Sequence, residues 1–350
     1  MTMDKKGLRN FLWLGILLLG TIWILTSRHW TTPYRTSTGL IFGTIYKVTY
    51  QYEKDLKTEI EAELKRMDGS LSPFNNTSII TRVNQNEDVV PDSFFVNVFR
   101  RSMEISRETD GAFDVTVAPL VNAWGFGFKK GTFPDKAMVD SLMEFTGYDK
   151  VRLSEAGKVV KCDARLMLSF SAVAKGYAVD VIAQMLQRKR ISHFMVDIGG
   201  EVVVRGSNPQ DDSWRIGINK PVDDSLAVNQ ELDTVLRLTG AAMATSGNYR
   251  NFYHKGGRKY AHTIDPRTGY PSQSDILSAT VVAGDCMTAD AYATAFMVMG
   301  MEATKRFLGR HPEIGAYLIF TDVEGKTARY ITPSLAPALV CREGEKGATL

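Results

Sequence analysis

The chain has 350 residues, enough for one large hydrophobic core or two ordinary ones. Hydrophobic residues make up 44% of it and charged residues 23%, as in a globular protein. Four of the 42 basic residues but one of the 39 acidic residues lie in the first 30 positions, so the rest of the chain holds 38 of each. This balance argues against a protein that binds nucleic-acid phosphates, because such a protein normally presents a basic face.

The first segment, residues 1–30, is polar and basic up to position 10 and apolar over 11–26. The apolar run has 16 residues, slightly fewer than the ~20 of a full membrane span. Bulky residues at 23–25 replace the small residues of a cleavage site, and no cysteine follows for a lipid anchor. We expect a signal anchor, or else a signal peptide, that places the remainder on the periplasmic side of the inner membrane. A buried helix of the globular domain is the alternative.

The middle of the chain alternates between strand-like and helix-like patterns. A linker at residues 31–38 precedes a run that is rich in β-branched and aromatic residues and predicts a strand from Gly39. Helical periodicity or turn signals predict helices at 54–67, 94–109, 135–145 and 174–188, and a hairpin pair over 151–170 that turns at 155–158.

The C-terminal part continues this mixture. The pattern predicts strands on both sides of a Gly-Gly turn at 193–205, further strands at 214–219, 235–238, 276–282, 316–320 and after Gly325, a loop at 241–249, a helix around Asp290 and another at 302–310. Because strict βαβ alternation is missing, we expect an α+β fold. A single domain over 39–340 and a tail at 341–350 complete the expected organisation.

The three cysteines are Cys162, Cys286 and Cys341, and no C-x-x-C pair occurs. Their spacing argues against a cysteine zinc site. The sequence leaves a disulfide between Cys162 and Cys286 open, since that question depends on geometry.

Asp290 and Thr294 lie four residues apart in an alanine-rich helical run, so their oxygens project from one helix face. A carboxylate and a hydroxyl in this arrangement suit a hard cation such as Mg²⁺, which keeps several waters and accepts substrate phosphate oxygens. In isolation the two residues would be ordinary helix residues. Asp285, a further carboxylate nearby, is expected at the surface.

Two other segments have alternative interpretations. Glycines beside aromatic rings at 124–127 (WGFG) allow a flavin or adenine ring to approach closely, or else form an aromatic-rich hairpin under a loop. The junction at 172–175 precedes a helix, whose N-terminal amides attract phosphate, so it is a candidate pyrophosphate site or simply a capped helix.

Several motifs, in order, resemble those of one family, the FAD:protein FMN transferases or ApbE family. The motifs are TDGAFDVTVAPLVNAWGFG (109–127), SAVAKGYAVD (171–180), VDIGGEVVVRG (196–206), SGNYRNFY (246–253), HTIDPRTGYP (262–271) and ADAYATAFMVMG (289–300). The resemblance extends over residues 38–335 and implies a single T-fold-like domain of mixed, mainly antiparallel sheets with packed helices.

The resemblance also implies a set of site residues. Mg²⁺ would be held by the side chains of Asp290 and Thr294 and by the backbone carbonyl of Ala174. FAD, as substrate, would contact Phe42, Ser72, Phe74, Asp110, Ala112, Phe113, Ala172, Lys175, Ser246 and Ile264. The chain departs from the family at Phe42, where methionine is usual, at Ala172, often threonine, and at Lys175, where some relatives have glutamate.

The reaction implied is transfer of FMN from FAD to a serine or threonine hydroxyl of an acceptor flavoprotein, with release of AMP. The resemblance gives His262 the catalytic role of general base, and Asp265 would orient the turn or hold the site. Two alternatives stay open. One is an Mg²⁺-dependent FAD pyrophosphatase that uses water, and the other is a membrane-tethered FAD-binding protein without turnover.

Overall fold

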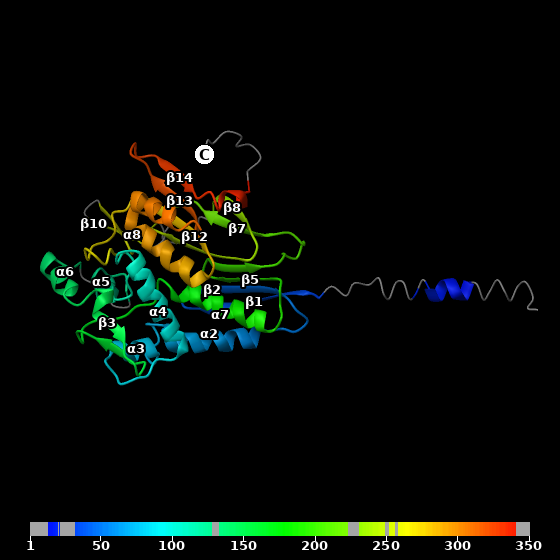
Figure 1. Cartoon of the computed structure of the whole chain (residues 1–350), viewed down its shortest axis with the longest axis horizontal. Coiled ribbons are helices and arrows are strands. Elements are labelled where there is room, and N and C mark those ends of the chain that lie inside the picture. Colours follow the sequence, from blue (N-terminus) through cyan, green and yellow to red (C-terminus); the bar gives the residue numbers. More distant parts are fainter. Residues whose placement is uncertain are drawn as a thin grey trace, which may run out of the picture.

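The computed structural model describes residues 13–19, 21, 32–127, 133–222, 231–248, 252–255 and 258–340 (Figure 1). Most of the expected signal anchor and the whole of the tail at 341–350 lie outside these residues. Residues 13–19 are helical. Within the described ranges, no helix combines the length and apolarity needed to cross a membrane. The expected N-terminal hydrophobic helix is therefore not confirmed.

An eight-stranded sheet forms the centre of the molecule, and each strand runs antiparallel to its neighbours. The expected α+β class with a mainly antiparallel sheet is thus confirmed. In spatial order the strands are β1 (Tyr34–Ile41), β2 (Thr44–Gln51), β5 (Phe194–Ile198), β6 (Glu201–Arg205), β9 (Ala241–Gly247), β12 (Ile276–Ala283), β13 (Gly315–Thr321) and β14 (Thr327–Ile331).

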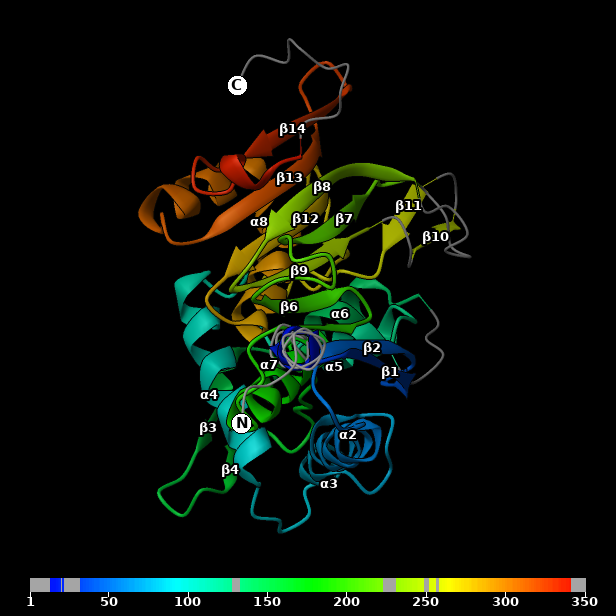
Figure 2. The same cartoon turned by 90° about the vertical axis from the view of Figure 1, so that its right-hand side faces the viewer.

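The two faces of this sheet are covered differently (Figure 2). Side chains alternate between the faces, so Ala316 and Leu318 of β13 join one core cluster and Tyr317 and Ile319 the other. The first face packs against the helices α2 (Lys57–Leu71), α7 (Ala174–Arg188) and α8 (Cys286–Arg310), and α4 (Ser93–Glu108) packs on α2 and α8. The second face packs against a two-stranded sheet of β7 (Trp214–Asn219) and β8 (Leu232–Leu238).

Shorter elements complete the described chain. They are α3 (Ile79–Asn84), α5 (Ala118–Ala123), α6 (Lys136–Met143), the 3-10 helices η1 (Tyr148–Lys150) and η2 (Ala336–Ala338), and the hairpins of β3 (Val151–Leu153) with β4 (Val159–Lys161) and of β10 (Phe252–Lys255) with β11 (Arg258–Ala261).

Three sequence predictions of local structure were wrong. The expected linker and the single strand after it are instead the hairpin of β1 and β2, which turns at Phe42 and Gly43 with positive φ at both residues. The expected loop at 241–249 is largely β9, a central strand between β6 and β12. Residues 165–170 form no strand. In each case sheet pairing, rather than local composition, determines the backbone.

Helices α7 and α8 are joined by two carboxylates, one on each helix, that accept hydrogen bonds from backbone amides of the other helix. Asp180 of α7 accepts hydrogen bonds from the backbone amides of Cys286 and Met287 at the start of α8, both at 2.8 Å. Asp290 of α8 accepts one from the amide of Gly176 in the first turn of α7, at 3.1 Å. Each carboxylate thereby satisfies amides that a helix start leaves without an intrahelical partner.

Gly176 makes this close approach possible. A Cβ atom at this position would lie 2.3 Å from the carbonyl oxygen of Cys286 and 2.8 Å from the Cβ of Asp290. Since one of these neighbours is backbone, a larger residue would push the two helices apart.

We expect Gly176→Ala to lower the free energy of unfolding by about 1–3 kcal/mol, because the added methyl group overpacks the contact between the helices. Gly309→Ala is the matched control, since Gly309 is an exposed helical glycine of α8 whose added Cβ would meet nothing within 4 Å. This control should gain up to about 1 kcal/mol from helix propensity. Urea unfolding of both variants measures the difference, and equal stabilities would contradict the packing described.

Candidate functional site

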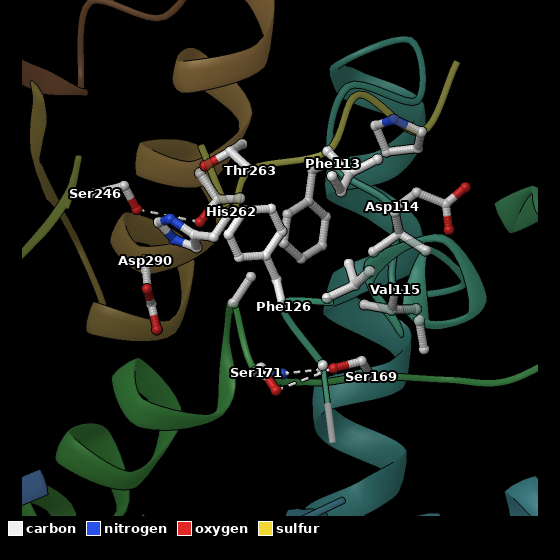
Figure 3. Close-up of a pocket in the computed structure, with 18 of the residues that line it drawn as sticks. Phe113, Asp114, Val115, Phe126, Ser169, Ser171, Ser246, His262, Thr263 and Asp290 are labelled. Atoms are coloured by element: carbon white, nitrogen blue, oxygen red, sulfur yellow. Dashed lines mark hydrogen bonds between the residues drawn. The ribbon is translucent and has the colours of Figure 1, made fainter. Parts of the chain in front are cut away.

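One cavity of about 450 Å³ lies where the first turn of α7, the N-terminal part of α8 and the segment 112–127 meet (Figure 3). It contains both apolar and polar wall residues, as expected of a small-molecule site. Its lining residues are Phe74, Ala112, Phe113, Asp114, Val115, Val117, Ala118, Val121, Asn122, Phe126, Gly127, Ser169, Ser171, Ala172, Lys175, Glu201, Thr245, Ser246, Gly247, His262, Thr263, Ile264, Pro266, Asp290 and Thr294.

Aromatic and aliphatic side chains from the segment 112–127 form the apolar wall. Phe113 and Phe126 are prominent there, and Figure 3 shows Phe126 beside His262. The ring centroids of Phe126 and His262 are 6.5 Å apart in an edge-on arrangement. This wall offers a surface on which a flat ring can pack.

The WGFG sequence is divided between the core and the cavity wall. Trp124 is buried, stacks on Tyr260 and donates a hydrogen bond from Nε1 to the carbonyl of Gly269, so it belongs to the core. Phe126 lines the cavity instead. A Cβ at position 127 would lie 1.8 Å from Oδ1 of Asn122, which explains the second glycine. The segment follows α5 and is not a hairpin.

Oxygen atoms from α8 and β9 form part of the polar wall. Asp290 and Thr294 both line the cavity, as their spacing on one helix face predicts. The hydroxyls of Thr294 and Ser246 are 3.2 Å apart. Asp290 is buried, and burial raises the pKa of its carboxyl group, against the opposing effects of Lys175 and the Gly176 amide. Binding a cation beside it would favour the ionised form.

A buried ion pair stands next to these oxygens. The ammonium of Lys175 contacts Oε1 of Glu201, the residue after the Gly199–Gly200 turn. Burial lowers the pKa of Lys175, but the carboxylates of Glu201 and Asp290 raise it more, so the group stays protonated. Burial raises the pKa of Glu201 to about 7 although Lys175 acts in the opposite direction. Among the described residues, Oε2 of Glu201 has no hydrogen-bond partner.

His262 follows β11 and begins a tightly held turn. Asp265 accepts hydrogen bonds from the amide and the guanidinium of Arg267, and its backbone carbonyl accepts from Gly269 at 2.8 Å. Asp265 therefore orients the turn, which was one of the two roles expected for it. Thr263 lines the cavity and donates to Asn248 at 2.9 Å.

The donors present fit a hard divalent cation. Asp290 supplies an anionic oxygen and Thr294 a hydroxyl in the same cavity wall. Oε2 of Glu201, which finds no hydrogen-bond partner within the described part of the chain, indicates a local excess of acceptor oxygens. Across the described ranges, no group of three or more His, Cys, Asp or Glu side chains is arranged around a common point. The side-chain donors fit Mg²⁺, which is usually held by one or two carboxylates together with water and substrate phosphate, better than zinc.

The cavity brings together ten of the fourteen predicted site residues. They are Phe74, Ala112, Phe113, Ala172, Lys175, Ser246, His262, Ile264, Asp290 and Thr294. Four predicted residues are not part of its lining. Phe42 sits at the tip of the β1–β2 hairpin, Ser72 caps α2, Asp110 occupies a left-handed turn after α4, and Ala174 begins α7 beside the cavity.

The helix start at 172–175 is only partly free to bind an anion. Val173 occupies the N-cap of α7 and makes no side-chain cap hydrogen bond. The amides of Ala174 and Tyr177 donate to the carbonyls of Phe170 and Val173, and that of Gly176 donates to Asp290. The positive group that this junction offers the cavity is therefore the Lys175 side chain rather than a row of helix amides.

Sequence reasoning missed several lining residues and misjudged one carboxylate. Glu201 was included only as part of a strand, although the acidic residue after a Gly-Gly turn is a usable signal. Ser169 and Ser171, whose hydroxyls are 3.0 Å apart, were given no site role, although Ser171 opens the matched motif at 171–180. Asp285, expected at the surface, is half-buried and caps α8 through the amide of Thr288 at 2.7 Å.

The structure decides whether Cys162 and Cys286 form a disulfide. Cys162 is exposed and Cys286 is buried, and both are free thiols, so the disulfide between them does not form. Cys341 lies outside the described residues.

An α+β domain whose sheet ends in a cavity with a histidine, a buried lysine and a carboxylate–hydroxyl pair has the composition of an enzyme active site. Comparison with known proteins defines the class further. Residues 42–318 match the model of the ApbE family. The chain belongs to the ApbE family.

Curated relatives and solved structures agree with this assignment. The chain is 36% identical over 275 residues to the FAD:protein FMN transferase of Vibrio cholerae serotype O1, covering 75% of this chain and 81% of that one. It is 33% identical to the Klebsiella pneumoniae protein of the same name, covering 90% and 92%. Like these relatives, the protein is a transferase.

The flavin transferase ApbE from Vibrio cholerae has a similar solved structure, with a TM-score of 0.79 at 33% identity over 88% of this chain and 99% of that one. The apo form of the flavinyl transferase ApbE from Pseudomonas stutzeri gives a TM-score of 0.77 at 28% identity, with 89% and 98% covered. The fold described above is therefore shared over nearly the whole of both chains.

Asp180 makes the stability of the helix pair depend on pH. Burial raises the pKa of its carboxyl group from 3.8 to about 7, against the two α8 amides that lower it. Between these values the folded chain binds more protons than the unfolded chain, so this group's contribution is present at low pH and lost as the pH rises through about 7.

We expect the free energy of unfolding to fall less between pH 4 and pH 8 for Asp180→Asn than for the wild type, because asparagine does not titrate. The difference between the two falls should be at most about 4 kcal/mol. Denaturant unfolding at several pH values measures both curves. Parallel curves for the two proteins would show that Asp180 does not titrate in this range.

Proposed function

We propose that the protein is a FAD:protein FMN transferase that moves FMN from FAD to a serine or threonine hydroxyl of an acceptor flavoprotein and releases AMP. The observation that carries the proposal is the division of one cavity into an aromatic wall and a polar wall with a histidine between them. The names of the relatives support the same reaction.

The two walls suit the two parts of a flavin dinucleotide. The rings of Phe113 and Phe126 offer packing surface to a flat heterocycle. The ammonium of Lys175 is held in place by Glu201 and is suited to neutralise the pyrophosphate. Phe74, whose surface is 70% exposed, lies at the cavity and is available to cover a bound ligand.

Asp290 and Thr294 would hold Mg²⁺, with the carbonyl of Ala174 as the third protein ligand. When bound there, the cation would withdraw charge from the pyrophosphate. Gly176 and Asp180 keep α7 and α8 together, so they fix the distance between the proposed ligands on the two helices. The Ser246 hydroxyl orients that of Thr294.

In the proposed reaction the oxygen of the acceptor hydroxyl bonds to the FMN phosphorus, and His262 accepts the proton of that hydroxyl. The bond from that phosphorus to the bridging oxygen breaks, and the oxygen leaves with AMP. The positive charge of Lys175 offsets negative charge that develops on the phosphate oxygens. Asp265 holds the turn that presents His262.

The two alternatives differ from transfer in their products. A pyrophosphatase gives free FMN and AMP, whereas a binding protein leaves FAD intact. Incubation with FAD, Mg²⁺ and a co-expressed candidate acceptor, followed by mass spectrometry of the acceptor, separates all three. An acceptor that carries FMN supports transfer.

The proposed location is the periplasmic side of the inner membrane, with residues 1–30 as the anchor. The support for this proposal is the sequence alone, namely the basic flank and the apolar run at 11–26.

We expect Asp290→Ala to lower Mg²⁺-dependent turnover of FAD about a hundredfold or more, because it removes the charged ligand of the proposed cation. Asp140→Ala is the matched control, an exposed carboxylate of α6 paired only with Lys136 among the described residues. Its turnover should equal that of the wild type. Titration of activity with Mg²⁺ makes the comparison, and full activity of Asp290→Ala would exclude the proposed ligand.

We expect His262→Ala to bind FAD normally but to transfer FMN about 10²–10⁴-fold more slowly, because the general base is lost. His311→Ala serves as control, since His311 stacks on Phe307 at the end of α8 away from the cavity. Equilibrium FAD binding and single-turnover transfer measure the two properties separately. A variant with unchanged transfer rate would remove His262 from the mechanism.

A further inference from the structure

A second cavity, of about 260 Å³, lies between β7 and the face of the main sheet that β7 and β8 cover. We call it the β7 groove. It is lined by Met195, Asp197, Gly199, Gly200, Val202, Arg215, Ile216, Gly217, Ile218, Asn219, Met243 and Thr245. Its floor includes Val202 of β6 and Met243 and Thr245 of β9.

The β7 groove meets the active-site cavity at the end of the sheet. Thr245 of β9 lines both of them. Gly199 and Gly200 line the groove, and the next residue, Glu201, lines the active-site cavity. A chain lying in the groove would therefore reach the polar wall of the active site by passing one β-turn.

One wall of the groove is an unpaired strand. In the described part of the chain β7 pairs only with β8, so its other edge has no strand partner. The far edge of β8 is covered, since Val340 donates to the carbonyl of Val235 and Leu339 bridges to Leu236. An open strand edge offers a row of backbone donors and acceptors that an extended peptide can pair with.

The composition of the groove favours a bound main chain. Three glycines expose backbone, and a Cβ at Gly200 would meet nothing within 4 Å. Its charged lining residues are one acid, Asp197, and one base, Arg215. The carboxylate of Asp197 already accepts a hydrogen bond from the Gly200 amide at 3.0 Å. A site of this kind accepts an extended segment with little demand on its side chains.

Resting on the proposed function, we infer that the β7 groove binds an extended segment of the acceptor protein, which adds as a strand to β7 and carries its serine or threonine past Thr245 to the active site. The other open edges of the main sheet, at β1 and β14, line neither of the two cavities. Only the β7 edge, among the described strands, combines an unpaired backbone with a connection to the reacting groups.

Two arginines of the same hairpin provide a matched test. Arg215 and Arg237 are cross-strand partners that both pair with Asp212, and their side chains are 58% and 47% exposed. Arg215 lines the groove, and Arg237 does not. Arg215→Trp should therefore obstruct the groove, while Arg237→Trp makes the same chemical change outside it. Asn219→Trp, at the other end of β7, is a second obstructing variant.

The probe is a library of randomised nonapeptides with a central serine or threonine, supplied with FAD and Mg²⁺ and analysed by mass spectrometry for FMN adducts. We expect kcat/KM for the peptides to fall about tenfold or more in Arg215→Trp and Asn219→Trp and to change less than about twofold in Arg237→Trp. FAD binding should be the same in all three, which also shows that each variant is folded. Hydrogen exchange of the β7 amides should slow when the peptides are added to the wild type.

Each other outcome has a definite meaning. If all variants label the peptides equally, the β7 groove does not bind the acceptor segment, while the proposed transfer function stands. A wild type that cleaves FAD but labels no peptide would also contradict binding in the β7 groove. A wild type that does neither would refute the proposed function itself. If Arg215→Trp instead converts a dimer to a monomer in light scattering with peptide labelling unchanged, the edge pairs with a second copy of the chain.

Discussion

The site depends on the reciprocal hydrogen bonds between α7 and α8, in which a carboxylate of each helix accepts from amides of the other. Asp180 satisfies two amides at the start of α8, and Asp290 satisfies one at the start of α7. Gly176 allows the two helices to approach closely enough for both contacts. As a result, the buried carboxylate of Asp290 and the Lys175 ammonium are brought to one wall of one cavity, at the cost of burying charge.

The sheet determines what surrounds that wall. Its helix-covered face positions α7 and α8, while its other face carries β7 and β8. The active-site cavity lies at the end where strands of both layers stop, so residues such as Thr245 are accessible from either side. This geometry suits a transferase, in which a nucleotide and an acceptor protein have to reach the same active-site residues without one blocking the other.

Much of this arrangement is predictable from the sequence where local signals and packing agree. The bounds of α7 and β7 match the predicted ones because each segment has a clear hydrophobic period and clear ends. The pairing of Asp290 with Thr294 follows from helix geometry alone. The strand β9 could not be predicted, since its alanines, threonine and serine resemble a loop until neighbours on both sides pair with it.

The other differences between the sequence predictions and the structure have the same physical origin. Asp110 belongs to a matched motif, and Phe42 and Ser72 lie within the span of the resemblance, yet turns and a helix cap place all three outside the cavity lining. Glu201 lies in the cavity because β6 pairs with β5 after a Gly-Gly turn, a contact that only the folded sheet defines. Pattern and resemblance identify the residues of a site more readily than they predict which side of a turn each residue occupies.

We propose that the first turn of α7 and the N-terminal part of α8 hold a divalent cation against a bound dinucleotide. A crystal grown with FAD and Mn²⁺ tests it most directly through the anomalous signal of the metal. We expect a peak within coordination distance of Asp290 and Thr294, beside the carbonyl of Ala174. A peak elsewhere, with FAD bound in the cavity, would contradict this proposal.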